Sequence, residues 1–313
     1  MRIWAVSIAA ALLALPGLAQ AGPTRPDPNA TVQAVMQAER DFAAYTKVHG
    51  YTKGFLDWSA PDAITFQPQA VRIHDKLAAA LAADPTLADK PTQLRWAPFY
   101  AGSASTGDVA FDLGPWTVEG GDRAGWFFTI WQKQADGSWR WTVDGGAGSD
   151  TPGNLPAPDK DLKLISNVDY TIPNGLNEGT AQDDSFNAAL GKIPAADAFA
   201  ALRGHQTTIA SDGVPPYISG YFPYPEGDGS PPAPPGANDK AAATKTAALA
   251  ARPAPGLTWS RDGQGAARSG DFVYTYGHAN AADGSYVGHY VRVWQKLTPD
   301  PGNWVLVVDV FQK

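Results

Sequence analysis

Residues 94–133 read LRWAPFYAGSASTGDVAFDLGPWTVEGGDRAGWFFTIWQK, and residues 257–296 read LTWSRDGQGAARSGDFVYTYGHANAADGSYVGHYVRVWQK. The two stretches align without a gap at a constant offset of 163 (257 − 94 = 163). Both keep Leu-x-Trp at the start, a Gly-Asp pair, two further glycines and a closing Trp-Gln-Lys. A repeat this long exceeds the roughly 20–50 residues of a solenoid unit. The sequence therefore predicts two tandem domains of one fold.

Each repeat continues into a turn and a last strand, where Trp139 and Asp144 match Trp304 and Asp309 at an offset of 165 (304 − 139 = 165). In the first copy, apolar residues recur at helical spacing before the strands begin. Helices followed by a run of antiparallel strands are typical of an α+β domain. The predicted helices are 31–49, 54–58 and 74–83, and the predicted strands are 62–66, 93–100, 108–116, 126–134 and 139–143.

Composition shifts divide the chain into segments. A Gly-, Pro- and Asp-rich stretch over 151–182 predicts a linker between a first domain at 28–150 and a second at 183–313. The second domain carries a proline-rich insertion at 221–239, which cannot join a helix or a central strand. We expect this insertion to be either an irregular excursion or a lid that folds over a cavity mouth with its tyrosines.

The first 21 residues have the features of a signal peptide. Arg2 precedes an apolar run from Ile3 to Leu15, and Ala19-Gln20-Ala21 resembles a cleavage site. The run is shorter than the about 20 residues of a membrane span. We therefore expect a periplasmic or secreted protein with no membrane attachment after cleavage. The net charge of −7, without clustered Lys or Arg, argues against a nucleic-acid partner.

Several local patterns point to one superfamily. They are Ala38-Glu-Arg-Asp-Phe42 on the first helix, Ala60-Pro-Asp-Ala63 before the short strand, and the closing Trp-Gln-Lys, Gly, Trp and Val-Asp. With these motifs the chain resembles the nuclear transport factor 2-like superfamily, and within it the SnoaL-like and ketosteroid-isomerase-like bacterial proteins. The resemblance implies two cone-shaped α+β-barrel domains, each with its N-terminal helices packed in a curved antiparallel sheet around an apolar cavity. Members include both enzymes and binding domains, so the fold does not determine the function.

Several kinds of site find no support in the sequence. The chain has no cysteine and no Gly-x-Ser-x-Gly, and its five histidines lack spaced partners, which argues against nucleophilic catalysis. No ligand spacing for a metal and no glycine-rich phosphate loop occurs. We therefore expect neither a metal nor another cofactor.

Residues that could line a cavity come mainly from the helices and from the insertion. Glu39 falls on the apolar stripe of the first helix and is either at its solvated edge or a carboxylate facing the pocket. The other expected ligand-binding residues are Tyr45, Trp58, Trp126, Tyr221 and Tyr224.

The expected catalytic residues lie in the second domain, because His289 replaces Trp126 at the matching position of the repeat. His289 is either a structural histidine or a base at a cavity rim, since histidine titrates near neutral pH. Asp144 and Asp309 either accept backbone N–H bonds or serve a site. The candidate catalytic set is His289, Asp309 and Tyr276.

These observations favour a non-catalytic protein that binds a small apolar or aromatic molecule. The alternatives are an isomerase- or hydrolase-type enzyme with an acid or base in domain two, and an interaction scaffold whose domains pack as an intramolecular pseudo-dimer. In each case we expect the domains to pack on each other. A homodimer is the other assembly that such a fold allows.

Overall fold

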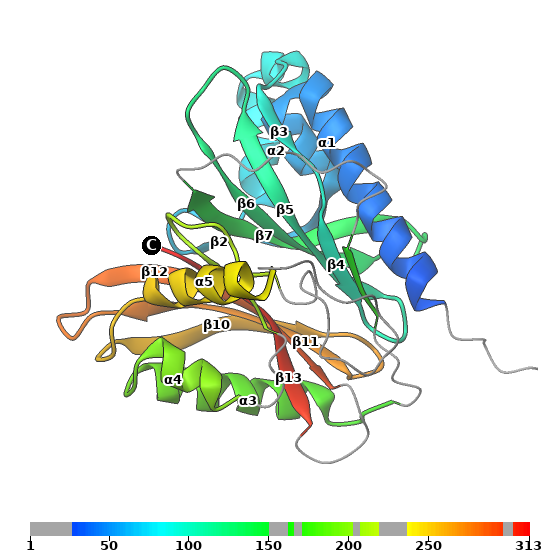
Figure 1. Ribbon diagram of the computed structural model, residues 1–313. Coiled ribbons are helices and arrows are strands. Elements are labelled where there is room, and N and C mark those ends of the chain that lie inside the picture. The colour runs from blue at the N-terminus through cyan, green and yellow to red at the C-terminus, as the bar shows by residue number, and fades with distance from the viewer. Residues whose placement is uncertain (1–26, 150–161, 166–170, 203–206, 219–236, 297–302) are drawn as a thin grey trace, which may run out of the picture.

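A computed structural model describes residues 27–149, 162–165, 171–202, 207–218, 237–296 and 303–313 of the chain. It is an α+β protein with two mixed sheets (Figure 1). We call 27–149 the N-terminal half and 171–313 the C-terminal half. The helices are α1 (Pro28–Trp58), α2 (His74–Ala83), the 3-10 helix η1 (Pro85–Asp89), α3 (Gly175–Leu190), α4 (Ala195–Ala200) and α5 (Ala237–Ala250).

The N-terminal sheet has the strand order β2-β1-β7-β6-β5-β4-β8, with β3 also pairing with β5. Strands β5, β6 and β7 form an antiparallel meander, and β1 pairs in parallel with β7. The strands are β1 (Ser59–Phe66), β2 (Ala70–Arg72), β3 (Leu94–Trp96), β4 (Tyr100–Ser103), β5 (Val109–Val118), β6 (Ala124–Lys133), β7 (Trp139–Ser149) and β8 (Leu162–Ile165).

The C-terminal sheet repeats this plan in the order β10-β11-β12-β13-β9. Its meander is β11, β12 and β13, and β9 pairs in parallel with β13 as β1 does with β7. Its strands are β9 (Thr208–Ser211), β10 (Thr258–Ala266), β11 (Phe272–Asn280), β12 (Tyr286–Lys296) and β13 (Trp304–Gln312).

Helix α1 contains both helical stretches predicted at its start and its end. Asp27 caps it by accepting a hydrogen bond from the backbone nitrogen of Asn29 at 2.9 Å, and Pro28 occupies the first turn, where no donor is needed. Gly50 interrupts the helix with a φ of 83°. A Cβ at this position would collide with the carbonyl oxygen of Lys90, so the bend requires glycine.

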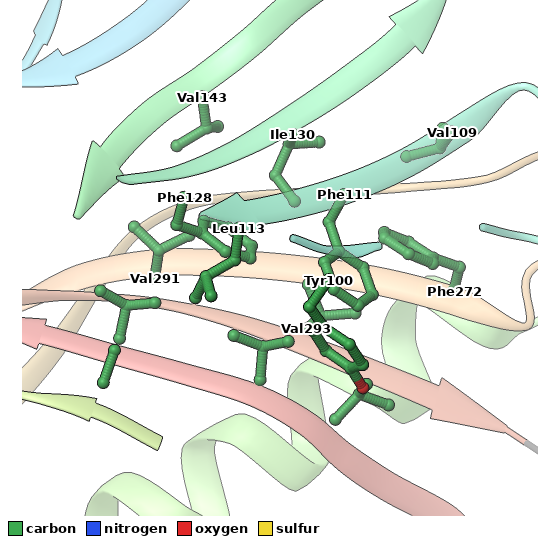
Figure 2. Close-up of a cluster of buried hydrophobic side chains, with 14 of the residues drawn as sticks. Tyr100, Val109, Phe111, Leu113, Phe128, Ile130, Val143, Phe272, Val291 and Val293 are labelled. Atoms are coloured by element: carbon green, nitrogen blue, oxygen red, sulfur yellow. The ribbon is translucent and has the colours of Figure 1, made fainter. Parts of the chain in front are cut away.

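The two sheets pack face to face, with α1 on the outer side of the N-terminal sheet and α3 and α4 on the outer side of the C-terminal sheet (Figure 1). Figure 2 shows the apolar core between the sheets. Because strand side chains alternate, every second residue of the meander strands points into this core. From the N-terminal sheet come Val109, Phe111, Leu113, Phe128, Ile130 and Val143, and from the C-terminal sheet Phe272, Val291, Val293, Val308 and Val310.

Polar contacts accompany this core at its edge. The backbone nitrogen of Ser105 donates to Asp271 at 3.1 Å, and the side chain of Gln295 donates to the carbonyl oxygen of Ser103 at 3.2 Å. The halves therefore share one buried core, with hydrogen bonds between them.

Some boundaries differ from the prediction. Helix α3 begins at Gly175, so residues 175–182 are helical rather than linker, and β8 places 162–165 in the N-terminal sheet. Helix α5 was not predicted; it includes the last three residues of the proline-rich insertion, 237–239. The signal segment 1–21 and insertion residues 221–236 lie outside the described residues. Among the described helices, none combines the length and apolarity that a membrane crossing requires.

Candidate functional site

A row of polar side chains crosses the N-terminal sheet on the face that α1 covers. Asp112 on β5 is the cross-strand partner of Thr129 on β6, and Thr129 is the partner of Asp144 on β7. Paired residues share a face and lie about 5 Å apart between Cβ atoms. The Thr129 hydroxyl donates to Asp144 at 3.1 Å. The sheet therefore brings two aspartates to the two sides of one threonine.

Helix α1 adds a third carboxyl group from above. Glu39 accepts one indole N–H from Trp96 at 2.5 Å and another from Trp131 at 3.1 Å. The Trp131 indole also reaches Asp112 at 3.2 Å, so the carboxyl groups of Glu39 and Asp112 are neighbours. Glu39 is fully buried, which excludes the solvated edge of the helix as its place.

Among the described residues, the three carboxyl groups have no compensating cation. In the described part of the chain, no ion pair joins Glu39, Asp112 or Asp144 to a basic side chain. Burial raises the pKa of Glu39 to about 7, against which the Trp96 and Trp131 hydrogen bonds act. Burial, and then the charge of Glu39, raises the pKa of Asp144 to about 8 and that of Asp112 well above its usual range. At neutral pH this cluster therefore holds protons.

A cavity of about 400 Å³ lies beside the cluster and reaches it at Asp144. Asp144 is half-buried, whereas Glu39 and Asp112 lie behind it, fully buried. Most of the wall is aromatic or aliphatic. The lining residues are Phe42, Tyr51, Phe55, Thr92, Leu94, Trp96, Trp116, Val118, Arg123, Phe127, Asp144 and Gly145.

Two polar side chains accompany Asp144 in this wall. Tyr51 is 43% exposed, and its ring stacks on Phe55 with centroids 4.1 Å apart. Partial burial, with a contribution from the charge of Asp144, raises the pKa of Tyr51 to about 12. Arg123 is exposed. The cavity therefore has one carboxyl group in an otherwise mostly apolar wall, with a solvated cation at its edge.

The matching row of the C-terminal sheet has a different composition. Thr275, Arg292 and Asp309 are cross-strand partners on β11, β12 and β13, at the positions that Asp112, Thr129 and Asp144 hold in the other sheet. Asp183 of α3 matches Glu39, because each accepts the indole N–H of the tryptophan that closes its repeat. The C-terminal half therefore has Thr275 where the N-terminal half has Asp112. It has Arg292 where the N-terminal half has Thr129.

Arg292 neutralises this second cluster. Its guanidinium donates to Asp183 at 2.9 Å and to Asp309 at 3.0 Å, and all three side chains are fully buried. Arg252 adds a second ion pair to Asp309 at 2.7 Å. The C-terminal cluster therefore balances two aspartates with two arginines, whereas the N-terminal cluster has three acids and no base among the described residues.

The structure brings one of the expected ligand-binding residues, Glu39, to the cluster. Trp126 was expected at a cavity but packs between the two sheets, because the alternating residue Phe127 faces α1 instead. Trp58 packs in the core against Phe42 and Trp131. Tyr45 lies half-buried on α1, where its hydroxyl donates to Asp57 at 2.6 Å. Tyr221 and Tyr224 lie outside the described residues, so their role stays a prediction.

The expected catalytic residues do not form one site, because they occupy opposite faces of the C-terminal sheet. His289 and Tyr276 face the core between the sheets, where His289 stacks on Phe66 at 3.9 Å. Burial lowers the pKa of His289 to about 4, so it is neutral at pH 7. Asp309 faces the helices and is paired with arginine. The face that carries His289 and Tyr276 packs at the sheet–sheet interface.

Sequence reasoning missed Asp112, Tyr51 and Arg292. Asp112 interrupts the apolar run from Val109 to Leu113, and Arg292 lies between Tyr290 and Trp294 on one strand face. A charged residue in the middle of a strand pattern is the signal that points to both. In the described residues, no group of three or more acidic or histidine side chains is arranged to hold a metal ion.

Fold and site together define an α+β protein with two packed sheets and an aromatic cavity that ends at buried acids. Solved structures similar to part of the chain include an NTF-2 like protein of unknown function from Shewanella oneidensis MR-1, at 16% identity and a TM-score of 0.27 over 36% of this chain and 92% of that one. A putative ketosteroid isomerase from Parabacteroides distasonis ATCC 8503 matches at 13% identity and a TM-score of 0.28 over 36% of this chain and 82% of that one.

An Ntf2 like protein involved in plasmid conjugation matches 87% of this chain and 96% of its own, at 8% identity and a TM-score of 0.20. No model of a protein family matches the sequence. No curated protein matches it either.

Proposed function

We propose that the chain is a tandem pair of one fold, in which the N-terminal copy binds a small molecule with an apolar or aromatic body. The cavity of about 400 Å³ takes the body of the ligand, and Asp144 contacts its polar group. Cavities of roughly 300–1,000 Å³ with few polar groups are typical small-molecule sites. The observation that carries the proposal is this aromatic wall with a single carboxyl group, supported from behind by two buried acids.

The C-terminal copy serves as a structural partner in this proposal. Its buried cluster is neutralised by the protein itself, through Arg292 and Arg252, and its sheet covers the N-terminal sheet with a shared core. In this proposal the C-terminal half takes the scaffold function, because it provides the surface on which the ligand-binding N-terminal half packs.

Blocking the cavity tests this proposal. Leu94 lines the cavity, and Leu257 holds the matching position of the repeat (257 − 94 = 163). Leu94→Trp fills the cavity with an indole, and Leu257→Trp is the matched control in the other half. The probe is N-phenyl-1-naphthylamine, a neutral aromatic dye whose fluorescence rises in apolar surroundings. We expect the natural chain and Leu257→Trp to bind the dye and Leu94→Trp to lose it. Equal binding by both variants, or none by the natural chain, contradicts the proposal.

Acid–base catalysis is a second candidate function, favoured by the titration of the cluster near neutral pH. A carboxyl group with a pKa of about 8 both donates and accepts a proton at pH 7 to 8, as a general acid or base requires. The catalytic site of this candidate function would be the N-terminal cavity, whereas the sequence suggests an acid or base in domain two.

A simple isomerisation tests this candidate. The probe is 3-cyclohexen-1-one, whose conversion to the conjugated 2-cyclohexen-1-one is followed by ultraviolet absorbance. Catalysis by the cavity predicts a rate above that of buffer, which Asp144→Asn returns to the buffer rate. If the rate with the natural chain never exceeds the buffer rate, the protein does not catalyse proton transfer on this type of substrate.

We also propose that the protein is exported to the periplasm or the cell exterior. The support is the charged start, the apolar run and the Ala-x-Ala pattern within residues 1–21. Expression of the full chain in a bacterial host, followed by fractionation and N-terminal sequencing, should find a periplasmic or secreted protein that begins at Gly22. An intact N-terminus in the cytoplasm contradicts export.

A further inference from the structure

We propose that the ligand of the N-terminal cavity is an organic cation, a protonated amine or quaternary ammonium group carried on an apolar or aromatic body. This inference rests on the proposed function, because it names the ligand class of the same cavity. It is carried by three observations: the charge of the acid cluster, the arginine at the matching place in the other half, and the rings around both places.

The charge of the acid cluster is the first observation. Glu39 and Asp112 are both fully buried and hydrogen-bonded to each other, and among the described residues no basic side chain forms an ion pair with either. Buried charges in proteins are normally paired, and buried polar atoms are normally hydrogen-bonded. At pH 7 the cluster holds protons in place of a counter-ion, and a cation at Asp144 would replace one of these protons.

The second observation is that the C-terminal half already contains a cation at the matching place. Arg292 stands where Thr129 stands, each as the cross-strand partner of the aspartate on the next strand. Its guanidinium lies between Asp183 and Asp309, the counterparts of Glu39 and Asp144. The shorter Thr129 leaves the corresponding position in the N-terminal half without a cation of its own.

The third observation is that the rings around Arg292 have counterparts in the cavity wall. The guanidinium carbon lies 4.9 Å from the ring centre of Phe186, 5.5 Å from that of Trp259 and 3.8 Å from that of Tyr290. Aromatic faces within about 6 Å attract a cation.

The counterparts follow from the repeat. The strand offset of 163 assigns Trp96 to Trp259 and Phe127 to Tyr290, and the helix offset of 144 (183 − 39 = 144) assigns Phe42 to Phe186. All three counterparts, Phe42, Trp96 and Phe127, line the N-terminal cavity. The cavity therefore keeps the rings and the acids of a cation site, but not its arginine.

An organic cation fits this cavity better than a bare metal ion or an anion does. Hard metal ions take about six or more oxygen ligands, and Asp144 is the one carboxylate among the residues that line this cavity. The cation among the lining residues is Arg123, which is exposed and screened by solvent. The aromatic wall favours a ligand with an apolar body attached to its charge.

Three probes of similar size but different charge test the inference: 2-phenylethylammonium, 2-phenylethanol and 3-phenylpropanoate. Each is titrated into the full chain by calorimetry at pH 7. We expect the ammonium to bind roughly ten-fold or more tightly than the alcohol, from cation–π attraction and the carboxylate pair. We expect the propanoate to bind more weakly than the alcohol.

Proton release gives a second readout. Asp144, with Glu39 and Asp112 behind it, holds protons at pH 7. The groups that face it across the cavity are Arg123 and Tyr51, and Tyr51, with its pKa raised to about 12, keeps its proton at this pH. A bound ammonium lowers the pKa of the cluster, so its binding should release protons. Titrations in buffers of different ionisation enthalpy measure this release, and the alcohol should show none.

Two variants locate the effect. Asp144→Asn should remove the preference for the ammonium over the alcohol, whereas Asp122→Asn, at an exposed acid near the cavity, should keep it. Thr129→Arg places the guanidinium of the other half in the cluster and should abolish ammonium binding without lowering the melting temperature. If Thr129→Arg fails to fold, the Asp144→Asn comparison decides alone.

The outcomes separate the ligand class from the site. Alcohol binding equal to or tighter than ammonium binding overturns the inference and leaves the proposed function standing. Tightest binding by the propanoate also overturns it and identifies Arg123 as the recognition residue. No binding by any of the three probes overturns both the inference and the proposed site.

Discussion

The same loss of charge at two matching positions should change stability in opposite directions. Glu39→Gln removes an acid from the cluster that pairs with no cation in the described part of the chain, and Asp183→Asn removes one from the cluster that Arg292 neutralises. Both substitutions keep the shape of the side chain. The contrast therefore isolates the charge balance of the two halves.

The magnitude for Glu39 follows from its pKa, which burial raises from 4.5 to about 7. Below pH 4.5 the group is protonated in the folded and in the unfolded chain, so it contributes no pH dependence. Between pH 4.5 and 7 the unfolded chain loses the proton while the folded chain keeps it, so the free energy of unfolding falls. The difference of about 2.5 pH units, at about 1.4 kcal/mol each, amounts to about 3 kcal/mol.

For Asp183 the expected loss is about 3–5 kcal/mol at pH 7, because the substitution leaves part of the Arg292 charge unpaired and buried. Urea unfolding, followed by tryptophan fluorescence at several pH values from about 4 to 8, measures both effects. Relative to the natural chain, Glu39→Gln should gain about 3 kcal/mol on going from pH 4 to pH 8. Asp183→Asn should be less stable at pH 7.

Two results would refute this reasoning. One is a stability difference between Glu39→Gln and the natural chain that does not change with pH. The other is a loss at pH 8 for Glu39→Gln as large as that of Asp183→Asn. Either result would mean that the N-terminal cluster is neutralised by a cation as the C-terminal cluster is.

Three further predictions concern the buried arginine, the sheet interface and the bend in α1. Arg292→Met should cost about 3–5 kcal/mol in urea unfolding at pH 7, because buried Asp183 loses its ion-pair partner and Asp309 keeps only Arg252; a loss below about 1 kcal/mol would contradict this. Phe66→Ala exposes His289, so its pKa should rise from about 4 toward 6.5 in an NMR titration; an unchanged pKa would mean that Phe66 does not bury it. Gly50→Ala should cost more than Gly120→Ala in melting temperature, because both glycines have positive φ but only Gly50 faces a backbone carbonyl; equal costs would contradict this account of the bend.

Much of the fold could be predicted from the sequence, because the elements repeat and their patterns are local. The apolar spacing of α1 and α2, and the strands around the Trp-Gln-Lys motif, follow from periods of 3.6 and 2. Helix α5 could not be found in this way. Its sequence from Ala237 to Ala250 is mostly alanine, lysine and threonine, so it shows little apolar periodicity although alanine favours helices.

The site was harder to predict, because alternation shows which residues share a face but not what that face contacts. His289, Val291 and Val293 share one face of β12, and this face packs on the other sheet. The two rows of polar side chains lie on the opposite faces of their sheets. Thr129 is at the centre of the row in the N-terminal sheet, and Arg292 is at the centre of the row in the C-terminal sheet. Contacts between residues more than 100 positions apart, such as that of Arg292 with Asp183, leave no local signal.

The measurement that tests the central claim most directly is a crystal structure of the protein purified from its native host, with any co-purified small molecule identified by mass spectrometry. The account predicts a ligand in the N-terminal cavity, with a nitrogen within about 3 Å of the Asp144 carboxylate and an apolar body against Trp96 and Phe127. A ligand held instead by the C-terminal half, or a cavity closed by its own side chains, would contradict it.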